Sequence, residues 1–307
     1  MMRRRTLIQG LPAALTVPLA LPSGNLLAQP AGPAGKTLNV AFRTPETSFD
    51  PVQTNSDQNS TVVISQILEA PLTYDYLARP VRLLPNTAAA LPEVSEDGRS
   101  FTVRLKPGIF FADDPAFNGK PRELVAQDHV YALKRFYDPR WNSSDLYVFE
   151  SLKLPGLTEL RNQAVKSGKP FDYDTEVEGV RALDRYTFRI RLGEADPRFV
   201  YNLAHATFMG AVAREVVERY GNDIGGHPVG TGPFRLKSWR RGSRIELERS
   251  PHYRGTRYEG TPAGEPWAQA IAARLGGKTL PLVDNVVFHV VEEEQPRWLS
   301  FLNGSYA

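Results

Sequence analysis

Five histidines are the side chains in this sequence best suited to acid–base chemistry or metal binding, because imidazole titrates near neutral pH and ligates metals. They are far apart in the chain: His129, His205, His227, His252 and His289. No HExxH motif pairs two of them on a helix, and no GxSxG motif presents a nucleophilic serine. The sequence therefore predicts structural or surface histidines, with no catalytic residue, no metal site and no cofactor.

A glycine-rich run, HPVGTGPFRLKSW at residues 227–239, is a candidate phosphate-binding loop. Such a loop offers consecutive backbone N–H groups and usually leads into a helix. Pro233 has no N–H, and the alternating pattern of a strand follows it. We therefore interpret the run as structural, the entry to a β-hairpin that turns at Gly242, with Gly230 and Gly232 adopting positive φ angles.

A polar loop that could bind a solute follows the first predicted strand. The strand KTLNVAF leads into RTPETSFDP, and open α/β sheets place ligands at the carboxyl ends of their strands. The loop offers four candidate binding residues, Thr44, Glu46, Ser48 and Phe49. An equally weighted alternative is that these residues cap the next helix or only form a turn.

Aromatic residues elsewhere could stack on a ligand, namely Trp141, Tyr147 and Trp239. We keep Trp141 and Tyr147 as candidate binding residues, although packing in the core or on the hairpin is the favoured alternative for all three. The acidic run at residues 292–294 could bind a cation, but an exposed charged segment is the favoured interpretation.

Hydrophobic periodicity predicts a mixed α/β fold. Alternation predicts strands at residues 36–42, 100–105 and 184–192 and the hairpin at 234–247. Helical spacing predicts helices at residues 60–68, 124–136, 197–204 and 213–220. The chain of 307 residues is 41% hydrophobic and 23% charged, which excludes disorder as its main state.

The first 28 residues have the layout of a secretion signal, with arginines at 3–5, an apolar run at 11–22 and no acidic residue. The apolar run falls short of the roughly 20 residues that span a bilayer, which favours a signal over an anchor helix. RRTLIQ, at residues 4–9, fits the twin-arginine and general secretory routes about equally. We expect residues 1–28 to be a cleaved signal peptide and residues 29–36 a flexible tether.

Charge and cysteine content agree with export. Loss of the signal removes three arginines, which takes the formal net charge from +3 to about zero. A neutral chain gives no electrostatic reason to expect nucleic-acid binding. The sequence has no cysteine, which excludes a disulfide framework and thiolate metal sites. We therefore expect a periplasmic protein that binds no nucleic acid.

Six segments, taken in order, resemble bacterial extracellular solute-binding proteins of family 5, the receptors of ABC importers that include oligopeptide, dipeptide and nickel binders. They are SFDP (48–51), ILEAPLTYD (67–75), LPNTAAALPEVSEDGRSFTVRLKPGIFF (84–111), AQDHVYALKR (126–135), GTGPFRL (230–236) and SPHYRG (250–255). The last two are the most recognisable, and Gly230, Gly232, Pro233 and Tyr253 are their structural signature residues.

The resemblance implies a two-lobed fold of the periplasmic-binding-protein type, truncated to its first lobe and the start of the crossing to the second. The first lobe would span residues 37–285, with a subdomain at about 52–180, and the incomplete crossing would span residues 286–307. Apolar surface around Phe288 and Trp298 would then be exposed. One departure from the family is the segment ADDPAFNGKPREL, which is longer than the turn that many members have at this position.

The resemblance also implies a function. The protein would be a monomeric receptor, not an enzyme, that captures a peptide or peptide-like solute and delivers it to an inner-membrane ABC permease. The loop at residues 43–51 would border the ligand cleft. An exported hydrolase on a similar scaffold and a non-binding fragment of the receptor are the alternatives.

Overall fold

The computed structural model describes residues 35–307, so the predicted signal peptide lies outside the described residues. The helices are α1 (Gln58–Ile67), α2 (Ala126–Arg135), α3 (Leu146–Ser151), α4 (Leu157–Ser167), α5 (Phe199–Asn202), α6 (Ala206–Met209), α7 (Arg214–Tyr220), α8 (Pro266–Leu275) and α9 (Glu294–Leu302), with 3-10 turns η1 (Pro51–Gln53), η2 (Pro115–Phe117) and η3 (Gly221–Gly226). The strands are β1 (Thr37–Phe42), β2 (Leu72–Tyr74), β3 (Leu83–Pro85), β4 (Glu93–Val94), β5 (Ser100–Arg104), β6 (Val180–Ala182), β7 (Thr187–Arg191), β8 (Phe234–Arg240), β9 (Arg244–Arg249), β10 (Thr256–Arg257), β11 (Thr279–Leu280) and β12 (Asn285–Val290).

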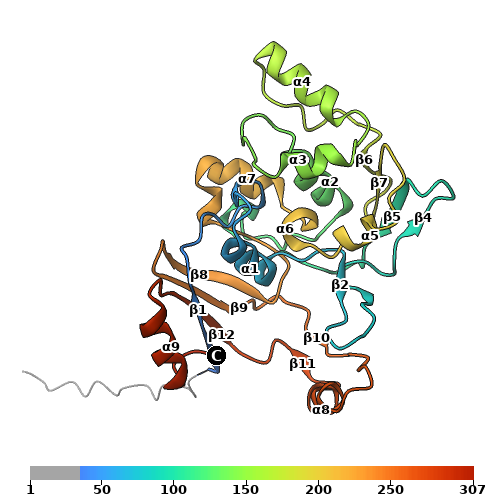
Figure 1. The fold of residues 1–307 in the computed structure, drawn as a ribbon. Coiled ribbons are helices and arrows are strands. Elements are labelled where there is room, and N and C mark those ends of the chain that lie inside the picture. Colours follow the sequence, from blue (N-terminus) through green and yellow to red (C-terminus); the bar gives the residue numbers. More distant parts are fainter. Residues whose placement is uncertain (1–34) are drawn as a thin grey trace, which may run out of the picture. The chain divides into compact units, whose positions relative to one another are not determined.

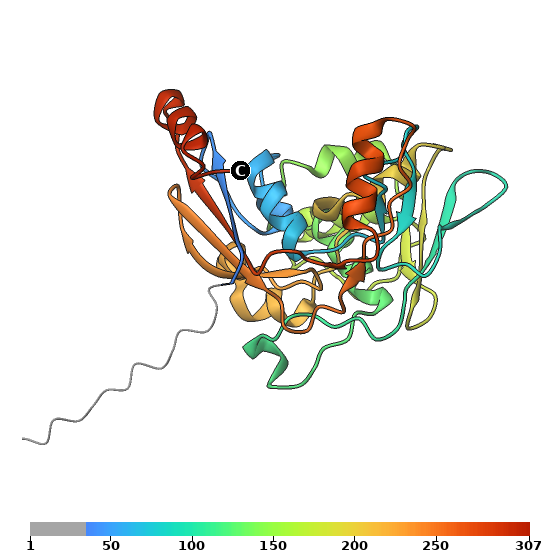
Figure 2. The ribbon, with the colours of Figure 1, turned by 90° about the horizontal axis from the view of Figure 1, so that it is seen from below.

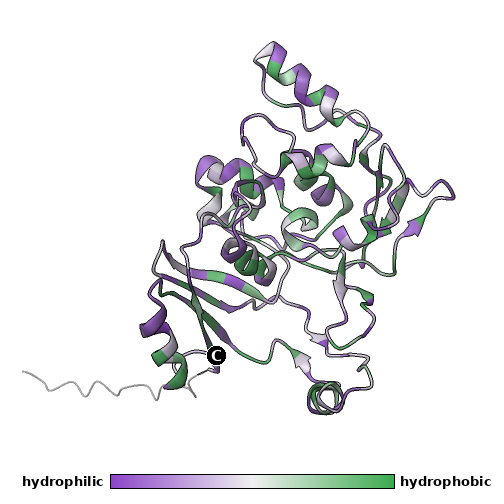
Figure 3. Cartoon of the chain, viewed as in Figure 1, coloured by the Kyte–Doolittle hydropathy of each residue, from purple (hydrophilic) through white to green (hydrophobic). Residues whose placement is uncertain are grey.

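A four-stranded sheet with the order β1-β12-β9-β8 has β1, the strand before the candidate binding loop, at its edge (Figure 1). β1 pairs in parallel with β12, with Thr37 opposite Asn285, and β12 pairs antiparallel with β9. β8 and β9 form the predicted hairpin, which turns at Gly242 with a φ of 64°. Hydrophilic and hydrophobic residues alternate along β8 (Figure 3), as expected for a strand that packs one face.

A second four-stranded sheet has the order β4-β5-β7-β6 and is covered by α2, which contacts β6 and β7. Phe101 of β5 lies opposite Ile190 of β7, so the alternating residues that predicted these strands share one face. The strands and the helix predicted for this region are confirmed. The first helical turn of α2 is held by Asp128, whose side chain accepts a hydrogen bond of 2.8 Å from the backbone N–H of Val125.

Two pairs of very short strands lie outside these sheets. β2 pairs with β3, and β10 pairs with β11 on either side of α8. Figures 1 and 2 both place α8 away from α9. No helix within residues 35–307 combines the length and the apolar character that crossing a bilayer requires.

One hydrophobic core extends between the two large sheets and takes in α1 and α2. Phe288 of β12 belongs to it, with only 3% of its surface exposed and its ring stacked on Phe42 at 4.7 Å. The expectation that Phe288 is exposed is therefore wrong, because β12 lies between β1 and β9 and is covered on its inner face. Trp298 of α9 is exposed, as expected.

The glycines of the GTGP run do not have the expected backbone conformation. Neither Gly230 nor Gly232 has a positive φ, so the predicted reason for glycine at these positions is wrong. Both lie against the last turn of α1, where an added Cβ would be 2.1 Å (Gly230) or 2.5 Å (Gly232) from the carbonyl oxygen of Ile67. The N–H of Gly232 donates to that oxygen at 2.8 Å. Glycine is needed because two backbone segments are in direct contact.

Candidate functional site

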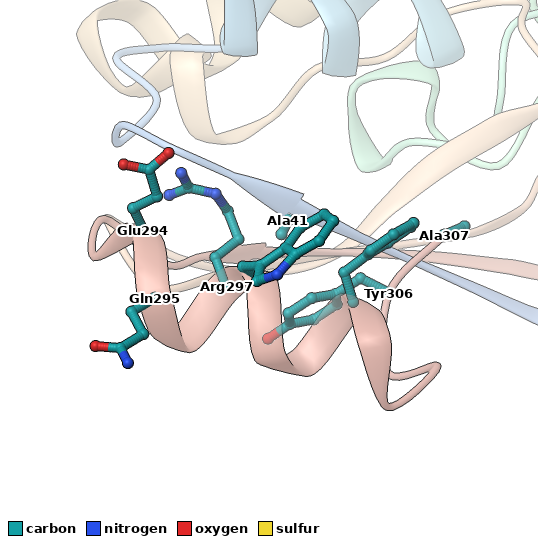
Figure 4. Close-up of a pocket in the computed structure, with 8 residues that line it drawn as sticks. Ala41, Glu294, Gln295, Arg297, Tyr306 and Ala307 are labelled. Atoms are coloured by element: carbon teal, nitrogen blue, oxygen red, sulfur yellow. The ribbon is translucent and has the colours of Figure 1, made fainter.

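A hollow of about 610 Å³ lies at the carboxyl end of β1, between this strand and α9 (Figure 4). Its volume is in the range of sites that bind small molecules. The lining is Ala41 from β1 and, from α9 and the chain after it, Glu294, Gln295, Arg297, Trp298, Phe301, Tyr306 and Ala307. The sequence predicted a binding region at the end of this strand, but it did not predict the residues of α9 as part of a site.

The lining offers an aromatic surface beside a cation. The rings of Trp298 and Phe301 stack at 5.5 Å, and both side chains are about half exposed. The guanidinium of Arg297 is held by the carbonyl oxygens of Val291 and Glu292, at 2.8 and 3.2 Å. Figure 4 shows the side chain of Arg297 extending from α9 toward β1. Such a surface can stack on apolar groups and attract a carboxylate.

The loop after β1, at residues 43–50, is fixed to the first turn of α1. The N–H groups of Thr47 and Ser48 both donate to the side-chain oxygen of Ser60, at 3.0 and 3.2 Å. Asp57 caps the same helix by accepting from the N–H groups of Asn59 and Ser60. The helix that follows the loop therefore sets the conformation of the loop.

Two of the predicted loop residues pack against the β8–β9 hairpin. Glu46 is buried, and its Oε1 accepts from the indole N–H of Trp239 at 2.5 Å and from the backbone N–H of Gly242 at 2.8 Å. The ring of Phe49 is fully buried 4.4 Å from that of Trp239. Trp239 thus packs on the loop, which is the favoured alternative for this residue.

The other two loop residues differ in exposure. Ser48 is buried, and its hydroxyl oxygen accepts from the N–H of Asp50 at 3.2 Å. Thr44 is exposed, and its hydroxyl accepts from the side-chain amide of Asn59 at 3.0 Å. Of the four predicted loop residues, Thr44 is the one whose side chain reaches solvent.

Asp50 connects the loop to α2 through a buried ion pair. Arg135 donates two hydrogen bonds to the carboxylate, at 2.6 and 2.8 Å, and both side chains are almost fully buried. The guanidinium lies 4.5 Å from the ring centre of Trp141, whose indole N–H donates to the Tyr173 hydroxyl at 3.2 Å. Trp141 is therefore a buried partner of this pair. Arg135 was not predicted, because nothing in its helical spacing distinguishes it from a surface arginine.

Tyr147 stands apart from the buried candidates. It lies on α3 and is 66% exposed. The structure thus brings Glu46, Ser48 and Phe49 together behind the loop, connects Trp141 to them through Asp50, and leaves Thr44 and Tyr147 facing solvent.

The GTGP and SPHYRG segments meet at a buried carboxylate, that of Glu69. The hydroxyl of Thr231 donates to Glu69 at 2.9 Å, and Arg254 donates twice to it, at 2.6 and 2.9 Å. Nearby, the hydroxyl of Tyr253 lies 2.9 Å from that of Thr256. These contacts join the two segments through one carboxylate. That the GTGP run is structural and not part of a binding site stays a prediction.

The histidines form no common site. His129 is buried with its ring stacked on Phe188 at 4.7 Å and its Nδ1 3.0 Å from the carbonyl oxygen of Met209. Burial lowers the pKa of His129 to about 4, against a smaller opposing effect of the Met209 carbonyl. Within residues 35–307, no group of three or more His, Cys, Asp and Glu residues is placed to hold a metal ion.

Residues 82–307 match the family model for the middle region of bacterial extracellular solute-binding proteins, family 5. The chain belongs to this family. The predicted family is therefore confirmed. Three of the proteins compared below are named as binding proteins.

Two relatives illustrate the sequence similarity. The glutathione-binding protein GsiB of Pectobacterium atrosepticum is 28% identical over 252 residues, which cover 82% of this chain and 39% of the relative. The oligopeptide-binding protein OppA of Bacillus subtilis is 27% identical over 220 residues, which cover 71% of this chain and 36% of the relative. This family 5 chain thus spans well under half the length of these relatives.

Solved structures of family 5 type show the fold. Haemophilus influenzae OppA in complex with the peptide RPPGFSPFR superposes with a TM-score of 0.65 at 21% identity, covering 89% of this chain and 45% of OppA. The murein tripeptide binding protein MppA of Escherichia coli gives the same TM-score and coverage at 22% identity. The predicted mixed α/β fold of the periplasmic-binding-protein type is confirmed. The division into lobes at residues 285 and 286 stays a prediction.

Proposed function

We propose that this chain takes part in binding a short peptide or peptide-like solute and that the receptor delivers it to an inner-membrane ABC permease. The observation that carries the proposal is the hollow at the carboxyl end of β1, in a chain of the family 5 solute-binding proteins. Relatives named for glutathione and oligopeptide binding support a peptide as the solute.

The exposure of each candidate residue suggests its role. Thr44 is exposed and would contact the solute, together with Trp298 and Arg297 in the hollow. Tyr147 is exposed on α3, which Figure 1 places far from α9, so a short peptide that fills the hollow would not reach it. Glu46, Ser48, Phe49 and Trp141 are buried and would position the loop. A peptide has a carboxylate that Arg297 can attract and side chains that Trp298 can stack on.

Calorimetry with mixed di- to pentapeptides on the purified protein tests this proposal. Replacement of Trp298 by alanine should weaken peptide binding by about tenfold or more, because exposed aromatic anchors contribute most to such interfaces. Trp267→Ala on α8 and Tyr76→Ala after β2 are matched controls, since both residues are similarly exposed but lie outside the proposed site.

Two outcomes would contradict the proposal. One is the absence of saturable binding of any peptide. The other is peptide binding that Trp298→Ala leaves unchanged, or that the two control substitutions weaken equally.

We also propose that the protein is exported and acts as a monomer in the periplasm. The support is the signal layout of residues 1–28 and the extracellular solute-binding family to which the chain belongs. Mass spectrometry of the periplasmic protein should find a new N-terminus near residue 28, and light scattering should give the mass of one chain. Mature protein that begins at Met1 would contradict export by a cleaved signal.

A further inference from the structure

A groove of about 310 Å³ lies between the β2–β3 pair and the β10–β11 pair. The groove shares no lining residue with the hollow described above, and Figures 1 and 2 both place α8, which follows β10, away from α9. The volume is sufficient for a small ring compound. The residues that matter for its chemistry are Tyr74, Asp75, Tyr76, Lys106 and Tyr258.

Lys106 provides a cation that forms no ion pair within the described residues. Its ammonium group donates one hydrogen bond, of 2.8 Å, to the carbonyl oxygen of Asn86, and no Asp or Glu of residues 35–307 pairs with it. Partial burial, together with the positive charge of Arg254, lowers the pKa of Lys106 against the opposing attraction of Glu69. Arg254 is itself held by two hydrogen bonds to Glu69. A partly buried ammonium group with unused hydrogen-bond donors favours an anionic partner.

Tyr258 provides a second donor in the same groove. Its hydroxyl is buried and has no hydrogen-bond partner within residues 35–307. Burial and the nearby Asp75 and Tyr76 raise the pKa of Tyr258, so the phenol stays protonated and can donate. A buried donor without an acceptor is unfavourable, and an acceptor on a ligand would relieve that cost.

The acidic residues of the groove do not supply the missing acceptor. Asp75 accepts from the N–H groups of Leu77 and Thr261, at 3.1 and 2.9 Å, so both of its oxygens are engaged. Glu259 also lines the groove and is exposed. Within residues 35–307, neither carboxylate bonds to the ammonium of Lys106 or to the hydroxyl of Tyr258.

The wall of the groove is aromatic. Tyr76 is 69% exposed, which leaves its ring accessible. Tyr74 also lines the groove, and its ring is stacked on that of Tyr201 at 6.5 Å. An exposed tyrosine ring next to a cation suits a planar ring that carries a negative charge.

We propose that this groove binds a small aromatic carboxylate, whose oxygens accept from the ammonium of Lys106 and the hydroxyl of Tyr258 while its ring stacks on Tyr76. This site is distinct from the proposed peptide site and does not depend on it.

Titration with benzoate, followed by ligand-observed NMR on the purified protein, tests the proposal. We expect saturable binding with a dissociation constant on the order of 1 mM, as ordinary ligand efficiency gives for a compound of this size. Lys106→Met should weaken binding by about tenfold or more, through the loss of a charged hydrogen bond. Tyr258→Phe should weaken it about threefold to tenfold, whereas Lys106→Arg keeps the charge and should retain most of the affinity.

Ligand controls separate the two halves of the site. Acetate carries the charge without the ring, and benzyl alcohol carries the ring without the charge, so both should bind at least about fivefold more weakly than benzoate. Tyr76→Ala should weaken benzoate binding while leaving peptide binding unchanged. Tyr258→Phe removes a single oxygen, so this variant keeps the test informative if Lys106→Met proves unstable.

Several results would overturn the proposal. One is the absence of saturable benzoate binding. Another is benzoate binding that the Tyr258→Phe variant and the Tyr76→Ala variant both leave unchanged. A third is binding of acetate or benzyl alcohol that is as tight as that of benzoate. Competition between benzoate and a bound peptide would also overturn it, because the two sites are then the same.

Discussion

Gly230 lies where the loop before β8 touches the last turn of α1, and a Cβ at this position would be 2.1 Å from the carbonyl oxygen of Ile67. Gly230→Ala should therefore force the two backbone segments apart. We expect the free energy of unfolding to fall by about 1–3 kcal/mol, the usual cost of overpacking. Thermal or urea unfolding, followed by circular dichroism, measures the change.

Gly264→Ala is the matched control for Gly230→Ala. Apart from Gly264 itself and its two chain neighbours, no heavy atom of residues 35–307 lies within 4 Å of a Cβ added at this position, and its φ is not positive. This variant should be about as stable as the parent. Equal stability of Gly230→Ala and Gly264→Ala would show that the loop can move away from α1 at no cost.

The role of Gly230 and Gly232 could be predicted only in part from the sequence. Pro233 and the strand pattern after it correctly indicated a structural turn. The reason for glycine could not be predicted, because it depends on contact with Ile67, which is distant in the sequence. Sequence patterns indicate local backbone preferences, whereas the close contact between these two backbone segments is set by tertiary packing.

His129 should make stability depend on pH. Burial lowers its pKa in the folded protein to about 4, below the ordinary value of 6.5, so the unfolded chain binds the proton more readily. Stability is then fully present above about pH 6.5 and is lost as pH falls toward 4, at a rate of at most about 1.4 kcal/mol per pH unit. Urea unfolding at a series of pH values from 4.5 to 7.5 measures this slope.

Two variants assign the slope to His129. His129→Asn keeps a side-chain donor for the Met209 carbonyl but does not titrate, so its pH dependence in this window should be flatter than that of the parent. Gly264→Ala changes no titratable group and should keep the slope of the parent. A parental slope in His129→Asn would mean that other groups cause the acid sensitivity.

At the scale of elements, α1 positions the candidate binding loop, and Asp57 caps this helix. Asp57→Ala removes the acceptor for the N–H groups of Asn59 and Ser60 and should cost about 0.5–2 kcal/mol of stability. Asp57→Asn keeps an acceptor and should lose much less. Chemical unfolding of both variants tests this, and equal stability of Asp57→Ala and the parent would contradict the role of the cap.

Long elements with a clear period could be predicted from the sequence, and short ones could not. The strands β1, β5 and β7, the hairpin β8–β9, and the helices α1, α2 and α7 are where alternation or helical spacing predicted them. β2, β3, β10 and β11 have only two or three residues each, too few to show a period. They form because distant segments pair, as Thr256 does with Leu280.

The candidate site, like the elements, could be predicted only in part from the sequence. The rule that ligands bind at strand ends indicated the loop after β1, because that rule depends only on the order of elements. Which loop side chains are buried depends on the hairpin that packs on them, as the bond between Glu46 and Trp239 shows. Burial of this kind could not be predicted from the loop sequence alone.

At the scale of the whole described chain, stability should be uneven. Nearly all of α2 is buried in the core, whereas none of the side chains of α9 is buried by the residues that the structure describes. Backbone amides of α9 should therefore exchange with solvent far faster than those of α2, since local opening exposes little apolar surface. Hydrogen exchange monitored by mass spectrometry checks this, and equal protection of the two helices would contradict it.

The parallel pairing of β1 with β12 has a consequence for the order in which the molecule can assemble. A ribosome releases β1 early, but Asn285, the partner of Thr37, emerges only after nearly all of the chain between them. The sheet formed by β4, β5, β7 and β6 uses residues 93–191 and can close during synthesis, while β1 still has no neighbour. The nascent chain therefore carries an unpaired strand until late in translation, and an unpaired strand is open to non-native pairing and to capture by chaperones.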